Sequence, residues 1–258
     1  MAELSELLPV EAIRLDLPAG DWREAIGLAG SLLTATGAAT EAYTTEMIVN
    51  VEENGPYIVI APGLAFAHAR PSPAVLRTGM SWVRLARPVE FGHEANDPVV
   101  QVVGLAAVDP KAHTSAMAAL AALLSDPAAA DALRSARSPE QVHALLGARP
   151  RTAPAPGGSA GRSGRHRLLT VCGNGVGTSL FLKGTLEQVL ERWRWTPYVG
   201  VEATDTISAK GQAAQASAIL TSREIARTLG DVGVPVMVVE DFTSTTEVDR
   251  VLRDLYDV

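Results

Sequence analysis

Residues 148–165 read ARPRTAPAPGGSAGRSGR, a run with no acidic residue and no large apolar side chain. Such a composition cannot bury enough apolar surface to offset the entropy lost on ordering, so it predicts a flexible linker. The linker divides the 258-residue chain into a front domain, residues 1–147, and a back domain, residues 166–258. Each of these segments is long enough to bury a hydrophobic core of its own.

The composition excludes several classes of protein. The hydrophobic fraction of 47% is ordinary for a globular chain, whereas the net charge of −7 argues against a nucleic-acid binder, which requires a basic surface. The single cysteine excludes an internal disulfide, and no pair of histidines has zinc-ligand spacing, so we expect no metal and no cofactor. The N-terminal sequence MAELSE is acidic where a signal peptide is basic, and the apolar stretch 116–124 is shorter than the ~20 residues of a membrane helix. We therefore expect a cytoplasmic protein.

The front domain mixes the periodicities of helices and strands. Strands are expected at residues 12–16, 57–61, 80–85 and 99–106. Helices are expected after an N-cap at Asp21 to about residue 35, at 40–52 with a stop at Asn54-Gly55, and at 112–124 and 127–146. Helices at both ends with strands between them predict an α/β sandwich.

The back domain alternates strands and helices regularly. Strands are expected at residues 167–172, 196–201, 216–220 and 234–239, and helices at 178–193, 222–229 and 244–255. This alternation predicts a four-stranded, parallel, doubly wound α/β sheet. Such sheets bind ligands at the carboxyl ends of their strands.

The only cysteine, Cys172, ends the first strand of the back domain and precedes a glycine-rich turn and a helix. Backbone N–H groups in such a turn form an anion-binding nest, and the helix N-terminus adds its positive dipole. The same dipole is expected to lower the pKa of the thiol. The segment predicts a nucleophilic cysteine in a phosphate cradle formed by Gly173, Asn174, Gly175, Val176, Gly177, Thr178 and Ser179.

Other interpretations of this segment fit less well. A nucleotide P-loop requires a lysine after the last glycine, and a dinucleotide-binding loop requires glycine where Thr178 stands. The signature of cysteine phosphatases requires arginine at the same position, where it would clamp the phosphoryl oxygens and favour hydrolysis. Its absence favours transfer to another acceptor, with a low-molecular-weight-type cysteine phosphatase as the alternative. A buried structural cysteine is the simplest alternative.

Two histidines of the front domain are candidates for phosphoryl chemistry. His68, in GLAFAHARP, is expected at a strand end or in a loop, and Arg70 can supply positive charge to a phosphoryl group on its ring. Histidine is a competent nucleophile because its pKa lies near neutrality. His113 begins a predicted helix, whose dipole is expected to lower its pKa so that the neutral ring can bond a phosphate. A lone histidine is more often structural, which is the expectation for His93, His143 and His166.

Together these motifs resemble a fused enzyme IIA–enzyme IIB component of the bacterial phosphoenolpyruvate-dependent sugar phosphotransferase system, ascorbate type. The front segments GPYIVIAPGLAFAHARP, FGHEANDPV and GLAAVDPKAHTSAMAAL are similar to enzyme IIA of the mannitol/fructose superfamily. The back segments RHRLLTVCGNGVGTSLFLK, VEATDTISAKG and PVMVVEDFTS are similar to enzyme IIB of the ascorbate/galactitol/lactose class.

The resemblance implies a phosphoryl relay. Phosphorylated HPr would donate to His68, His68 to Cys172, and the phosphocysteine to a sugar, expected to be L-ascorbate or a related acidic sugar, held by a membrane enzyme IIC. His113 matches the second histidine of the IIA site, which supports the phosphoryl group without carrying it. Membrane association is expected only through the transporter. The linker would keep each site near the other at an effective concentration of around a millimolar. A phosphorylation-controlled regulatory module that acts through a partner protein is the alternative outside the enzymes.

Overall fold

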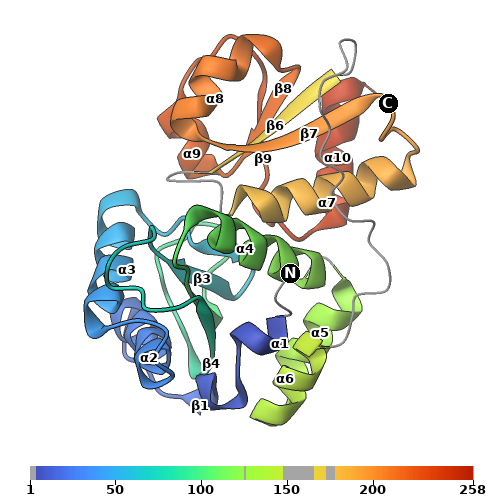
Figure 1. The fold of residues 1–258 in the computed structure, drawn as a ribbon. Coiled ribbons are helices and arrows are strands. Elements are labelled where there is room, and N and C mark those ends of the chain that lie inside the picture. Colours follow the sequence, from blue (N-terminus) through green and yellow to red (C-terminus); the bar gives the residue numbers. More distant parts are fainter. Residues whose placement is uncertain (1–3, 125, 148–165, 173–177, 258) are drawn as a thin grey trace.

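The computed structural model describes residues 4–124, 126–147, 166–172 and 178–257 (Figure 1). The expected linker, 148–165, lies outside the described residues. The elements of the front domain, in chain order, are α1 (Leu4–Leu7), the short 3₁₀ helix η1 (Val10–Ala12), β1 (Ile13–Leu17), α2 (Trp22–Ala35), α3 (Glu41–Asn54), β2 (Val59–Ala61), β3 (Leu64–His68), β4 (Gly79–Val89), β5 (Val99–Ala106), α4 (Pro110–Leu124), α5 (Pro127–Ser135) and α6 (Pro139–Gly147).

The front domain is built on a five-stranded mixed sheet in the order β1-β4-β5-β3-β2. Successive side chains of a strand point to opposite faces, so each strand contributes to two cores. Trp82 and Val103 pack on the face covered by α4, α5 and α6, and Val83 and Val102 on the face covered by α2 and α3. The expected α/β sandwich is confirmed.

The back domain is built on a four-stranded, all-parallel sheet in the order β7-β6-β8-β9. Helices α7 and α10 pack on one face of this sheet, and α8 and α9 on the other. The expected doubly wound sheet is confirmed. Its elements are β6 (His166–Cys172), α7 (Ser179–Arg192), β7 (Val199–Asp205), α8 (Thr206–Gln212), the 3₁₀ helix η2 (Ala213–Gln215), β8 (Ala218–Thr221), α9 (Arg223–Leu229), β9 (Val236–Val238) and α10 (Thr245–Tyr256).

Several boundaries differ from the expectations. The helix expected over 127–146 is two helices, α5 and α6, because Pro139 lacks the N–H that would continue the first of them. The strand expected at 196–201 begins only at Val199, after a turn in which the N–H of Tyr198 bonds the carbonyl of Trp195. Helix α8 was not expected, and β3 was expected only as one of two settings for His68, at a strand end or in a loop. All five side chains of β3 are buried, so its sequence lacks the alternation of a half-exposed strand.

The two domains pack directly against each other, with α4 lying along α7 (Figure 1). The rings of Phe66, from β3, and Phe181, from α7, meet with their centroids 5.7 Å apart. The backbone N–H of Phe242 donates to the carbonyl of Ile60, on the edge strand β2, over 3.1 Å. One hydrophobic cluster therefore continues from the front sheet through α4 and α7 into the back domain.

No single helix in the described ranges has both the length and the hydropathy needed to cross a membrane. Pro110–Leu124 and Ala128–Ser135 form a pair bent by 95° that satisfies only the length and composition criteria. The apolar side chains Met117 and Leu120 of the first helix are fully buried in the core.

Candidate functional site

His68 is the last residue of β3 and is only 5% exposed. Its Nδ1 lies 2.9 Å from the carbonyl oxygen of Phe66. Because a carbonyl can only accept, Nδ1 carries the ring proton and the lone pair is on Nε2. Burial lowers the pKa of His68, so the ring is neutral and Nε2 is available as a nucleophile at physiological pH.

His113 lies beside His68, in the first turn of α4, with the ring centroids 5.3 Å apart. Burial, and then the charge of His68, lower the pKa of His113 to about 3. The expected direction is confirmed, but its cause is desolvation and a neighbouring ring, where we expected the helix dipole. Nδ1 of His113 is buried and has no hydrogen-bond partner among the described residues, so it can bond an added group.

The lowered pKa of His113 predicts a dependence of stability on pH. The unfolded chain binds a proton at this histidine below about 6.5 and the folded chain only near 3, so the stability present above pH 6.5 is lost as pH falls through this window. We expect His113→Gln to lose less stability than the wild type between about pH 7 and about pH 5. Urea unfolding followed by tryptophan fluorescence measures the difference. Equal losses in the two proteins would show that His113 titrates normally in the folded chain.

A face of α3 that the sequence analysis did not single out contacts the backbone of His68. Tyr43, Met47 and Asn50 recur at helical spacing on the side of α3 that faces the sheet, and the exposed Asn54 follows Asn50 by one turn. The side-chain amide of Asn50 donates to the carbonyl of His68 over 3.2 Å and to the hydroxyl of Tyr57. A polar asparagine on an otherwise apolar helical stripe is the signal that would have found this group.

The backbone after His68 is fixed by a buried tyrosine. The hydroxyl of Tyr43 donates to the carbonyl of Leu105 over 2.8 Å and accepts the N–H of Ala69 over 3.1 Å. Arg70, which follows, is exposed at the rim of the site. Burial raises the pKa of Tyr57, and the charge of Arg70 opposes this with a smaller effect, so the guanidinium acts on the site from its edge.

Cys172 is the last residue of β6 and is 4% exposed. Its Sγ donates to Oγ of Ser179 over 3.4 Å, and Oγ1 of Thr170 holds the carbonyl of Ser179 over 2.9 Å. Burial raises the pKa of the Cys172 thiol, and hydrogen bonds from Ser179 and Thr178 only partly oppose it. The expected lowering of this pKa is therefore wrong, because desolvation outweighs the donors at the start of α7. Of the expected cradle, Gly173, Asn174, Gly175, Val176 and Gly177 lie outside the described residues.

The surroundings of His68 and Cys172 meet at the domain interface. The ring of Tyr57 stands nearly perpendicular to that of His68, with centroids 5.8 Å apart. After burial, the largest cause that raises the pKa of Tyr57 is the charge of a Cys172 thiolate in the other domain. The contact of Phe66 with Phe181 lies alongside, two residues before His68 and two after Ser179. Tyr57 therefore lies within electrostatic reach of both candidate nucleophiles.

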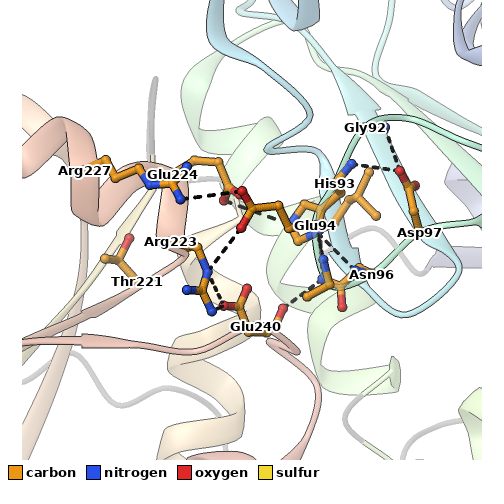
Figure 2. A network of polar contacts seen from close by, with 12 residues as sticks. Gly92, His93, Glu94, Asn96, Asp97, Thr221, Arg223, Glu224, Arg227 and Glu240 are labelled. Carbon is orange, nitrogen blue, oxygen red and sulfur yellow. Dashed lines mark hydrogen bonds and ion pairs between the residues drawn. The ribbon is translucent and has the colours of Figure 1, made fainter.

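A polar network joins the domains beside the apolar contact (Figure 2). Glu94, in the loop before β5, lies 3.6 Å from Arg223 and 3.5 Å from Arg227, both on α9. The buried amide of Asn96 donates to the carbonyl of Glu240 over 2.8 Å. Nδ1 of His93 accepts the N–H of Asn96, which shapes the loop that carries these contacts.

The other two histidines lie away from both nucleophiles. Nε2 of His143, on α6, is 3.2 Å from the carbonyl of Ser5. His166, the first residue of β6, is exposed at the end of the strand opposite Cys172, where its ring packs against Tyr256.

Comparison with known proteins gives a family for each domain. Residues 6–148 match the family model "Phosphoenolpyruvate-dependent sugar phosphotransferase system, EIIA 2", and residues 167–254 match "PTS system, Lactose/Cellobiose specific IIB subunit". The ascorbate-specific EIIA component of Salmonella choleraesuis is 40% identical over 136 residues, which are 52% of this chain and 88% of that protein. The corresponding component of Escherichia coli K12 is 39% identical over 137 residues, 53% of this chain and 89% of that protein.

A solved structure agrees with the front domain. The mannitol-specific cryptic phosphotransferase enzyme IIA of Escherichia coli is 33% identical, with a TM-score of 0.52 over 57% of this chain and 99% of that one. Together with the site, these matches define a phosphotransferase. The chain belongs to the EIIA 2 family of the sugar phosphotransferase system, with a IIB domain fused behind the IIA domain.

Proposed function

We propose that this protein relays phosphoryl groups within one chain, from His68 of its IIA domain to Cys172 of its IIB domain. The observation that carries the proposal is the docking of the two domains, with Tyr57 next to His68 and within reach of the charge of Cys172. Two buried nucleophiles at one interface are suitably placed for direct transfer of a phosphoryl group from one to the other. The proposed domains are residues 1–147 and 166–258, joined by a flexible linker at 148–165.

The chemistry of each step follows from the side chains. Nε2 of His68 takes the phosphoryl group from phosphorylated HPr, and His113 and Arg70 stabilise its charge from the ring side and the rim. The Sγ lone pair of Cys172 then attacks phosphorus as the P–N bond breaks. The bonding pair returns to Nε2, and the thiol proton is released to water. In the proposed cradle, Gly173 to Ser179 hold the phosphoryl oxygens on the cysteine.

The partners of the relay are phosphorylated HPr and a membrane enzyme IIC that holds the sugar. Both nucleophiles are at most 5% exposed in the docked arrangement, so each partner reaches its residue only when the domains separate. The relatives named ascorbate-specific support L-ascorbate as the sugar. The relay would work in the cytoplasm, at the membrane only through the transporter.

Radiolabel transfer tests this function. Purified protein is incubated with labelled phosphoenolpyruvate, enzyme I and HPr, and mass spectrometry locates phosphate on His68 and Cys172. Addition of membranes that contain the cognate enzyme IIC should move the label to ascorbate. Release of inorganic phosphate without an acceptor, at the rate of a phosphatase turnover, would favour the phosphatase. Stable label that no transporter discharges would favour a regulatory module.

The polar network predicts how tightly the domains are held. Glu94→Arg replaces two interdomain attractions, to Arg223 and Arg227, with repulsions. Since exposed ion pairs are weak, we expect a threefold to tenfold rise, roughly, in the rate at which iodoacetamide alkylates Cys172, which reacts only in the separated state. Glu52→Arg is the matched control, because Glu52 pairs with Arg23 inside the IIA domain. Equal alkylation rates in the wild type and Glu94→Arg would show that this network does not hold the domains together.

A further inference from the structure

The hydrogen bonds of Asn50 determine the direction of the Tyr57 proton. The carbonyl oxygen of His68 can only accept, so Asn50 must present its NH₂ group to it. The oxygen of the same amide supports this orientation, since Oδ1 of Asn50 accepts a hydrogen bond from the side-chain amide of Asn54 over 2.9 Å. The same NH₂ group is bonded to the Tyr57 hydroxyl, which is therefore the acceptor in that bond. The O–H of Tyr57 consequently points away from Asn50.

The O–H of Tyr57 has no acceptor among the described residues, and Tyr57 is only 7% exposed. Its ring stands against His68, and one amide group links its oxygen to the backbone of His68. A buried donor that is left without an acceptor is costly, so its persistence indicates a partner that is present only in part of the cycle. The phosphoryl group that His68 carries is an anionic acceptor at this place.

We propose that Tyr57 is a phosphoryl-binding residue, which donates its O–H to an oxygen of the phosphoryl group on His68 and keeps this bond during transfer to Cys172. The inference rests on the proposed relay. The phosphorus–Nε2 bond breaks, the phosphorus–Sγ bond forms, and the Tyr57 proton stays on its oxygen throughout. Tyr57 thus stabilises the charge that spreads over the phosphoryl oxygens between the two nucleophiles.

Tyrosine suits this position for electrostatic reasons. Burial, and then the charge of Cys172, raise the pKa of Tyr57, so the phenol keeps its proton beside a thiolate and a phosphoryl dianion. A neutral donor adds no charge that would favour the phosphoryl group on His68 over Cys172. Arg70, at the exposed rim, supplies the positive charge separately.

The first test detects the hydrogen bond without the relay. In Cys172→Ser, phosphoramidate phosphorylates His68 chemically, and ³¹P NMR follows the titration of the phosphoryl group. Adding Tyr57→Phe removes a donor that favours the dianion, so the titration midpoint should move to higher pH. A purely structural role for the hydroxyl would leave the midpoint in place.

The second test measures the transfer step in the full chain. Tyr57→Phe should slow the passage of phosphate from His68 to Cys172 by about 10- to 100-fold, the effect of losing one hydrogen bond to a charged group. Tyr256→Phe is the matched control, because its buried hydroxyl also has no acceptor among the described residues, but its ring packs against His166 at the far end of β6. An unchanged midpoint or an unchanged transfer rate would overturn the proposal. Failure of the parent chain to accept phosphate from HPr would instead overturn the relay, and the NMR titration would still test Tyr57.

Discussion

His68→Ala is expected to abolish labelling of both domains by phosphorylated HPr. His68 combines a lone pair on Nε2, fixed by the bond of Nδ1 to Phe66, with a pKa lowered by burial. Burial, and then the charge of His68, lower the pKa of its neighbour His113 to about 3, so this ring too is neutral, and the proposed relay assigns it the supporting role. Removing a nucleophile in such a system costs orders of magnitude in rate. Quenched-flow labelling, with phosphate located by mass spectrometry, measures the loss on each domain.

His113→Ala is the informative companion. It should slow the loading of His68 while leaving acid-labile phosphohistidine in place, because a supporting group is lost and the acceptor remains. If His113→Ala lost all label and His68→Ala kept it, the two roles would be reversed. Undiminished label on Cys172 in His68→Ala would mean that HPr reaches the cysteine by a path without His68.

Cys172→Ser is expected to trap phosphate on His68 and to stop sugar phosphorylation. The substitution keeps the size of the side chain and its neighbours Ser179 and Thr178, but a hydroxyl has a far higher pKa than a thiol and is a poor nucleophile here. Label should therefore enter the IIA domain at the normal rate and remain there when transporter membranes are added. Gel autoradiography after a chase with unlabelled phosphoenolpyruvate follows its decay.

The wild type provides the comparison for this experiment, since its label should leave His68 within the same chase. Phosphate on the hydroxyl that replaces the Cys172 thiol would show that the IIB site activates any hydroxyl placed in it. Normal sugar phosphorylation by the variant would remove Cys172 from the relay altogether.

Much of the fold could be predicted because its elements have local causes. The N-cap of α2 was expected at Asp21, whose side chain accepts the N–H of Glu24 over 2.9 Å. Helix α3 ends as expected at Asn54, where Gly55 adopts a φ of 77°. Strand β5 has the expected bounds, Val99–Ala106. For strand β3 the sequence left open whether His68 ends a strand or lies in a loop, because complete burial removes the alternation from which strands are recognised.

The residues of the candidate site also fall into those that local sequence indicates and those that it does not. His68, His113, Arg70 and Cys172 were expected from their types and motifs. Asn50 and Tyr57 were not, because they reach His68 from a helix 18 residues upstream and from the segment before β2. The direction in which the pKa of the Cys172 thiol shifts was predicted wrongly, for a related reason. A helix N-terminus, which lowers a thiol pKa, can be recognised in a sequence. The burial that raises the pKa of Cys172 by more depends on which residues pack around its side chain.

The two α/β domains and the candidate phosphoryl carriers could be predicted from the sequence alone, because periodicity, caps and glycine-rich turns act over a few neighbouring positions. How those residues meet depends on the packing of the two domains. Docking of α4 on α7 and of Glu94 on α9 brings the surroundings of His68 and Cys172 together, although the two residues are more than a hundred positions apart in the chain. Burial in the folded chain lowers the pKa of His68 and raises the pKa of the Cys172 thiol. Desolvation depends on all the surrounding atoms, and no short stretch of sequence specifies them.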